Sequence, residues 1–311
     1  MCTAVIYKNR YFGRNLDYEC SFGESVVITP RAFPFSFPDG IAWERHHAII
    51  GIAHVADGYP LYYDAVNEKG LAMAGLMFAG NAVYHGSAQG KDNIPTWAFL
   101  PWVLGQCASV AEAEGLLEDL NLTDEPFNSA LPPTPLHWMI ADQERSIVVE
   151  STAAGLRVYD DPVGVLTNNP PFPFHLDNLT QYLNLTAAVP KNRFSHKVEL
   201  EPFSRGMGAI GLPGDLSSAS RFVRAAFVKL NSVSEEEGDV SQFFHILGAV
   251  EQQRGCVHLG EGKYEVTIYS SCCDMEKGIY YFKTYDDHCI TAVDMYAQSL
   301  DGSGLQRLQT V

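Results

Sequence analysis

The first twenty residues, MCTAVIYKNRYFGRNLDYEC (1–20), decide the fold. The run CTAVIY (2–7) alternates in polarity and is rich in residues that favour strands. KNR (8–10) has the composition of a turn, and YFGRNLDY (11–18) returns as a second strand. The stretch therefore predicts a β-hairpin that places a thiol at the head of its first strand.

The thiol of Cys2 gains a chemical meaning if Met1 is removed. Residue 2 then carries a free α-amine, whose ordinary pKa of about 8 makes it a proton acceptor near neutrality. Nucleophile and base are joined in one residue, as in N-terminal-nucleophile enzymes. Arg14 would place a cation near the thiol, and Asp17 would orient the α-amine through hydrogen bonds. The hairpin alone leaves two readings open, a structural cysteine and a catalytic one.

Composition and charge exclude several partners. The net charge of −16 and pI near 4.9 oppose binding to nucleic acid or to an anionic membrane surface. No apolar run is long enough to span a membrane, and Lys8, Asn9 and Arg10 interrupt the region where a signal peptide would lie. The seven cysteines are odd in number and show no disulfide-like spacing, which predicts a reducing, cytoplasmic compartment.

Strands and helices come in blocks. Strand-like runs fill much of residues 25–80 and 136–167, and three more end the chain, around 264–274, 278–287 and 289–295. Helical spacing marks 217–232 and 240–253, and a further helix reaches residue 120, opened by a capping box at Ser109 and Glu112. This order favours an antiparallel α+β fold over a doubly wound parallel sheet. With no linker-like segment, the chain is expected to form a single domain, 1–311.

Two motifs point to cofactors but lack the required context. Gly206–Gly211 matches G-x-G-x-x-G, yet no strand precedes it and LPGD follows it, so a flexible loop is the better interpretation. His46 and His47 are adjacent, which in a strand turns their side chains to opposite faces. No zinc-type spacing of His or Cys is present. We therefore expect neither a cofactor nor a metal.

Arg221 is unusual because it lies in the first turn of a predicted helix, where the helix dipole disfavours a cation. Either solvent tolerates it, or it is aimed at an anion or a reacting group.

Several blocks are spread from end to end of the chain: MCTAVIY, FGRNLD, NEKGLAMAGL, LHWMIAD, GVLTNNP, GLPGDLSSASRFVR and EKGIYYFKTYDD. Together these blocks resemble the choloylglycine hydrolase family of bile salt hydrolases and the related penicillin V acylases. The resemblance implies an N-terminal-nucleophile fold, in which two antiparallel sheets lie between helical layers (αββα). It also implies hydrolysis of linear amides without metal or cofactor, and a homotetramer.

The same resemblance assigns roles to individual residues. The nucleophile falls on Cys2, the activating arginine on Arg14 and the aspartate on Asp17. Asn168 and the backbone N–H of residue 77 form the oxyanion hole, and Arg221 is the second active-site arginine. Residue 77 departs from the pattern, because it is Met77 where bile salt hydrolases usually have Asn and penicillin V acylases often have Tyr.

Substrate contacts follow from matching positions. Arg205 lies on the family loop that approaches the conjugated amino acid, which favours taurine over glycine conjugates. The lining expected for the steroid is apolar: Leu16, Phe22, Ala56, Tyr63, Phe127 and Leu131.

The expected activity is hydrolysis of glycine- or taurine-conjugated bile salts by Cys2 after Met1 removal. The alternatives are penicillin V acylase activity, acyl transfer to amines, and a bile-acid or lipid-binding protein with a dead site. The intact set of Cys2, Arg14, Asp17, Asn168 and Arg221 argues against the last, because binding alone needs no such set.

Overall fold

Two antiparallel sheets form the centre of the molecule. A computed structural model describes residues 1–40, 42–235 and 238–311. The first sheet has the strand order β14-β1-β2-β17-β18-β19, in which the neighbouring β1 and β2 are the expected hairpin. Its strands are β1 (Cys2–Tyr7), β2 (Tyr11–Tyr18), β14 (Val165–Leu166), β17 (Val266–Asp274), β18 (Ile279–Thr284) and β19 (Thr291–Asp294).

The second sheet has the order β13-β12-β11-β8-β7-β6-β3-β20. Its strands are β3 (Ser25–Thr29), β6 (Ile49–Ala56), β7 (Tyr59–Asn67), β8 (Ala72–Met77), β11 (Leu136–Ala141), β12 (Ser146–Thr152), β13 (Gly155–Asp160) and β20 (Gln306–Thr310). Three short pairs lie outside the two sheets: β4 (Phe35–Ser36) with β5 (Ala42–Trp43), β9 (Asp92–Pro95) with β10 (Leu120–Thr123), and β15 (His258–Gly260) with β16 (Lys263–Tyr264).

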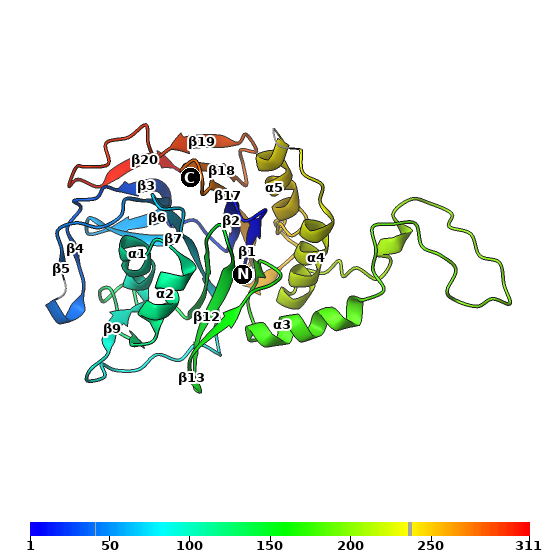
Figure 1. Cartoon of the computed structure of the whole chain (residues 1–311), viewed down its shortest axis with the longest axis horizontal. Helices are drawn as coiled ribbons and strands as arrows, with labels where there is room; N and C mark the ends of the chain where they lie inside the picture. The colour runs from blue at the N-terminus through cyan, green and yellow to red at the C-terminus, as the bar shows by residue number, and fades with distance from the viewer. Residues whose placement is uncertain (41, 236–237) are drawn as a thin grey trace.

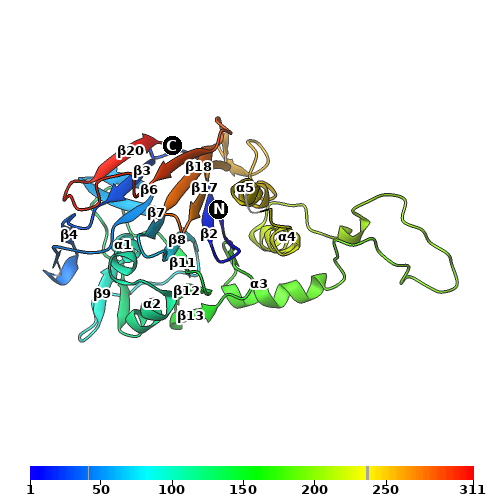
Figure 2. The same ribbon diagram turned by 45° about the horizontal axis from the view of Figure 1, so that its top comes forward.

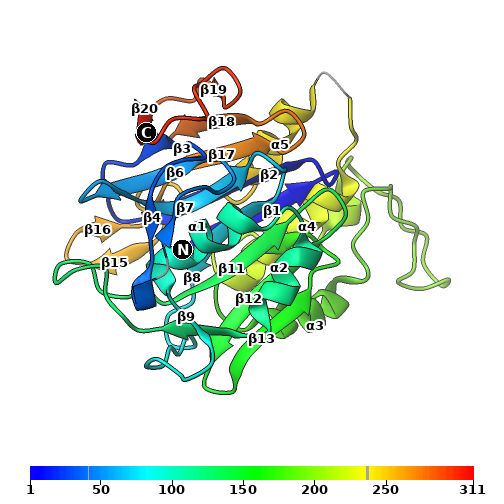
Figure 3. The same cartoon turned by 60° about the vertical axis from the view of Figure 1, so that its left-hand side comes forward.

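Helices cover the outer faces of both sheets (Figures 1 and 3). One apolar core joins the facing sheets and continues to α3 (Phe172–Leu179), α4 (Ser218–Asn231) and α5 (Asp239–Gly248). The other lies between the second sheet and α1 (Thr96–Gln106) and α2 (Val110–Leu117). Single-turn 3₁₀ helices are η1 (Pro38–Gly40), η2 (Thr180–Tyr182) and η3 (Met207–Ala209). The layers run helix, sheet, sheet, helix, which confirms the expected αββα sandwich.

The predicted start of α2 is confirmed, whereas two helices end earlier than predicted. Ser109 caps α2 by accepting a hydrogen bond from the backbone N–H of Glu112 at 3.2 Å. That helix ends at Leu117 rather than 120, because Leu120 begins β10. The helix expected over 240–253 ends at Gly248. α1 and α3 were not predicted, since α1 is apolar on nearly every side and contains Pro101.

A long segment between η2 and α4 projects away from the rest of the molecule (Figures 1 and 2). We call residues 183–216 the arm. It contains the glycine loop, which forms η3 and leaves Gly206 and Gly211 at positive φ, so the loop interpretation is confirmed. Apolar side chains on the arm are exposed, with Leu183, Phe194 and Phe203 at 86, 85 and 88%. Among the described helices, none is long and apolar enough to cross a membrane.

Candidate active site

Cys2 begins β1, which lies between β14 and β2 in the first sheet, and it is buried, with 2% exposure. The hairpin holds it opposite Leu16, across a turn in which Lys8 and Asn9 both adopt positive φ. The peptide N–H of Cys2 donates to Oδ1 of Asn168 at 2.7 Å. The head of β1 thus lies inside the protein, in contact with the loop that follows β14.

Arg14 is fully buried on β2, with its guanidinium directed at the second sheet. Its Nη1 donates to the carbonyl oxygens of Gly75 at 2.5 Å and Tyr63 at 3.1 Å. Its Nη2 has no hydrogen-bond partner among the described residues. Burial lowers the pKa of Arg14, but the nearby Cys2 thiol and the Tyr269 hydroxyl outweigh it and raise that pKa. Arg14 is therefore a permanent cation beside the thiol.

Asp64 is a fully buried carboxylate that interacts electrostatically with Arg14, and it is not among the residues predicted from the sequence. It accepts hydrogen bonds from the hydroxyls of Tyr269 at 2.6 Å, Ser271 at 2.9 Å and Tyr280. Burial raises the pKa of Asp64, and Arg14 opposes the rise. The only sequence signal is a carboxylate in the middle of an apolar strand, where an unpaired charge is too costly to bury.

Asp17 is the next-to-last residue of the same β2 strand and is also fully buried. Its Oδ1 accepts from Thr267 Oγ1 at 2.6 Å, and its Oδ2 accepts from Gln252 Nε2 at 3.3 Å. Oδ2 also lies 3.9 Å from Nη1 of Arg221. Burial raises the pKa of Asp17, and the Arg221 guanidinium is the strongest influence that opposes the rise.

Arg221 ties the site together from the start of α4. Nη2 donates to Oδ1 of Asn168 at 2.7 Å, and Nη1 donates to the carbonyl oxygen of Cys2 and to Oγ1 of Thr3, both at 2.6 Å. The side chain is fully buried, so it is not a solvent-tolerated cation. Burial lowers the pKa of Arg221, and Asp17 and Cys2 oppose this.

Asn168 joins the two sheets at the site. While its Oδ1 accepts from Cys2 and Arg221, its Nδ2 donates to the carbonyl oxygen of Met77 at 2.7 Å. Met77 is the last residue of β8, so the end of that strand meets the loop after β14. The structure thus brings Cys2, Arg221, Asn168 and Met77 into direct contact.

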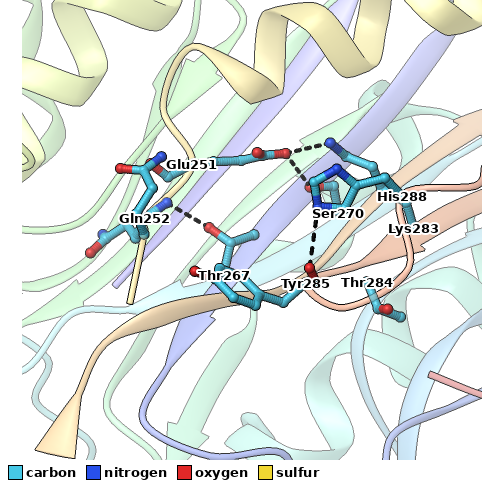
Figure 4. A pocket seen from close by; sticks show the side chains of 9 residues that line it. Glu251, Gln252, Thr267, Ser270, Lys283, Thr284, Tyr285 and His288 are labelled. Carbon is cyan, nitrogen blue, oxygen red and sulfur yellow. Dashed lines mark hydrogen bonds and ion pairs between the residues drawn. The ribbon is translucent and has the colours of Figure 1, made fainter. Parts of the chain in front are cut away.

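A cavity of about 240 Å³ adjoins Asp17 (Figure 4). Thr267 and Gln252, both donors to Asp17, form part of its wall, and a Glu251–Lys283 ion pair of 2.6 Å forms another part. The remaining lining residues are Gln253, Ser270, Thr284, Tyr285 and His288. The nine residues that line this cavity are all of polar or charged types and include none of the apolar residues expected to contact a steroid.

The expected apolar lining falls into separate places. Leu16 is buried opposite Cys2, and the carbonyl oxygen of Tyr63 contacts Arg14. Phe127 lies outside that cluster. Its backbone N–H donates to the carbonyl oxygen of Leu131 at 3.1 Å, and its ring packs on the ring of Tyr59.

Two of the expected substrate residues lie further out. Ala56 pairs with Tyr59 at the end of β6, and so adjoins the group around Phe127. Phe22 is 49% exposed, with its ring 5.4 Å from that of Tyr18.

Arg205 is not brought to the cluster within one chain. It is exposed on the arm beside η3, and the arm extends away from the N-terminus in both views (Figures 1 and 2). No group of three or more metal-ligating side chains occurs in the part of the chain that the structure describes.

The layered fold with a cysteine heading its first strand defines the class as N-terminal-nucleophile hydrolases. The family model of linear amide C–N hydrolases, choloylglycine hydrolase family, matches residues 2–307. The chain belongs to this family.

Similar proteins and solved structures support the same family assignment. The chain is 55% identical to a bile salt hydrolase/transferase from Lactiplantibacillus plantarum, over 98% of this chain and 95% of that protein. The C2A mutant of conjugated bile acid hydrolase from Clostridium perfringens superposes with a TM-score of 0.91 at 38% identity, over 99% of this chain and 97% of that one. Penicillin V acylase from Agrobacterium tumefaciens has a TM-score of 0.76 at 19% identity, over 99 and 91% of the two chains, which shows a shared fold.

Proposed function

We propose that this chain hydrolyses the amide bond of glycine- or taurine-conjugated bile salts, with Cys2 as nucleophile after Met1 is removed. The contact of Cys2 with Asn168 and Arg221, beside the buried Arg14, is the observation that carries the proposal. The 55% identity to a bile salt hydrolase/transferase supports the substrate class. The chemistry needs no cofactor, and we propose that residues 1–311 act as one domain.

The proposed reaction has two steps. The Cys2 sulfur attacks the amide carbonyl, and the α-amine takes the thiol proton and passes it to the leaving nitrogen. Asn168 Nδ2 and the Met77 N–H stabilise the oxyanion, where one donor is worth about 3 kcal/mol of barrier. Glycine or taurine leaves, and a thioester joins Cys2 to the bile acid. Water then attacks the thioester, which releases the bile acid and returns the proton to Cys2.

A comparison of hydrolysis rates on different substrates tests the proposal. We expect kcat/KM for glycocholate and taurocholate to exceed that for penicillin V by about tenfold or more, a difference that buried apolar contacts readily supply. Rates are measured side by side on purified enzyme. Faster cleavage of penicillin V would overturn the assignment in favour of the acylase. Hydrolysis and acyl transfer are separated by adding excess glycine or another amine and measuring the ratio of products. Hydrolysis gives free bile acid, whereas acyl transfer gives a bile acid conjugated to the added amine.

We also propose that the Arg205 cation favours taurine conjugates through the sulfonate. Because the arm points away from its own Cys2, this role requires the arm to reach the site of a second copy. Arg205→Ala should lower the taurocholate-to-glycocholate ratio of kcat/KM by about threefold, a small effect since an exposed charge pair is worth at most about 1 kcal/mol. An unchanged ratio would remove Arg205 from substrate selection.

A homotetramer is the assembly we propose, with the arm as a contact between copies. Exposed phenylalanines on a projecting segment are typical of a surface that another protein covers. Light scattering should give four times the 34.3 kDa of one chain. Phe203→Asp should shift the mass to smaller species, whereas Leu230→Asp on α4, also exposed, should not. A monomeric parent protein would contradict the proposal.

We further propose a cytoplasmic location. All seven cysteines are free in the structure, including the exposed Cys20, Cys256 and Cys289, which supports a reducing compartment.

A further inference from the structure

The backbone ammonium and carbonyl groups of Met1 are both bound by neighbouring residues. Its ammonium donates to the carbonyl oxygen of Asp17 at 2.8 Å, and its carbonyl oxygen accepts from the Asp17 N–H at 3.0 Å. The carboxylate of Glu265 makes an ion pair with the same ammonium. We call these three groups, the Glu265 carboxylate and the Asp17 C=O and N–H, the Met1 slot.

Glu265 contributes a buried carboxylate to the Met1 slot. Its side chain is only 6% exposed, while that of Met1 is 29% exposed, so the slot opens to the surface and its carboxylate lies at depth. Among the described residues, Glu265 makes no other ion pair within 4 Å. A buried carboxylate without a cation is costly, so removal of Met1 creates a demand for another ammonium group.

The slot lies beside the reacting groups. Burial lowers the pKa of the Met1 ammonium, and the Cys2 thiol and the Asp17 carboxyl oppose this, while Arg221 and Arg14 add to it. The ammonium therefore lies within the electrostatic reach of all four groups, and its direct contacts are with the Asp17 carbonyl oxygen and the Glu265 carboxylate.

We propose that the Met1 slot binds a free small α-amino acid, such as glycine, once Met1 has gone. The ligand ammonium pairs with Glu265 and the Asp17 carbonyl oxygen, and its carboxylate accepts from the Asp17 N–H near the new α-amine of Cys2. The spacing of ammonium, one carbon and carboxyl repeats the backbone of Met1. Taurine has one more carbon and a sulfonate, so it fits less well. The inference rests on the proposed removal of Met1, and it predicts that glycine competes with conjugated substrate.

Calorimetry on the Cys2→Ala protein, checked by mass for loss of Met1, tests binding without turnover. Glycine should bind saturably, at least tenfold more tightly than methylamine, acetate or taurine, each of which lacks one element of the match. Glu265→Gln in the same background should weaken glycine binding tenfold or more. Glu261→Gln, the same change at an exposed site nearby, should leave glycine binding unaltered.

Two results would overturn the inference. One is glycine binding no tighter than acetate; the other is equal glycine affinity in the Glu265→Gln and parent proteins, with both shown to be folded by circular dichroism. Protein that keeps Met1, made while methionine aminopeptidase is inhibited, should not bind glycine. Binding to that form would place glycine elsewhere.

The outcome is separable from that of the proposed function. Bile salt cleavage by Met1-free enzyme without glycine binding would refute the inference alone. Glycine binding by a protein that cleaves no bile salt would refute the proposed substrate alone.

Discussion

Cys2→Ala should abolish amide hydrolysis, with a loss of kcat of about 10⁴-fold or more, as removal of a catalytic nucleophile does in other hydrolases. The matched control is Cys107→Ala. Cys107 is also buried, but it directly follows the last residue of α1 and belongs to the other apolar core, and burial raises its pKa to about 12, so it stays an inert thiol. Its variant should keep activity within about twofold. Rates on glycocholate compare the two proteins, and substantial cleavage by Cys2→Ala would refute the nucleophile.

Intact mass and peptide mapping complete that test. Active protein should lack Met1, because the nitrogen of Cys2 in a peptide bond has no lone pair available to accept the thiol proton. Cys20, Cys256 and Cys289 are exposed and will also react with thiol reagents, so the adduct must be located on the N-terminal peptide. Full activity in protein that retains Met1 would refute the role of the α-amine.

Arg221→Met should destabilise the protein by about 3–5 kcal/mol and remove activity, because it leaves the buried Asp17 without its nearest cation. It also removes the donors that hold Cys2 O and Asn168 Oδ1. Urea unfolding at pH 7 measures the stability. Arg224→Met is the control: it lies on the same helix but donates to carbonyl oxygens such as Ala249 O, so about 1 kcal/mol is expected.

The pH dependence of the Arg221→Met effect has a definite sign. Burial already raises the pKa of Asp17, and loss of Arg221 raises it further. A carboxyl whose pKa is higher folded than unfolded favours folding at low pH, and this contribution is lost as pH rises through the folded pKa. The variant should therefore be closer to the parent in stability at pH 5 than at pH 8. Asp17→Asn combined with Arg221→Met should recover part of the loss; equal deficits at both pH values would contradict the ion pairing.

The sequence predicted best what depends on neighbours in the chain. Period-two alternation and the KNR turn predicted the β1–β2 hairpin, and the capping box predicted the start of α2. α1 was not predicted, because a helix buried on most sides lacks an amphipathic pattern. The direction of the arm was not predicted either, because no local sequence pattern specifies the direction of a segment that makes few contacts.

Within the site, the resemblance supplied Cys2 and Arg221 as residues, but not their contact. That contact joins positions 219 apart in the chain, and it follows only from tertiary packing. Glu265 and Asp64 were missed for a related reason. Each is one acidic residue in a strand-rich run, and its partners lie far away in the chain: the Met1 ammonium for Glu265, and hydroxyls of β17 and β18 for Asp64.

The position of β1 has a consequence for biosynthesis. The strand pairs with β14 and β2, and β2 pairs in turn with β17, which begins at Val266. The sheet that buries Cys2 is therefore incomplete until most of the chain has left the ribosome. At about 5–20 residues per second, this leaves the N-terminus accessible for on the order of tens of seconds. If Met1 is removed as proposed, an aminopeptidase has that interval to act before folding closes over its substrate.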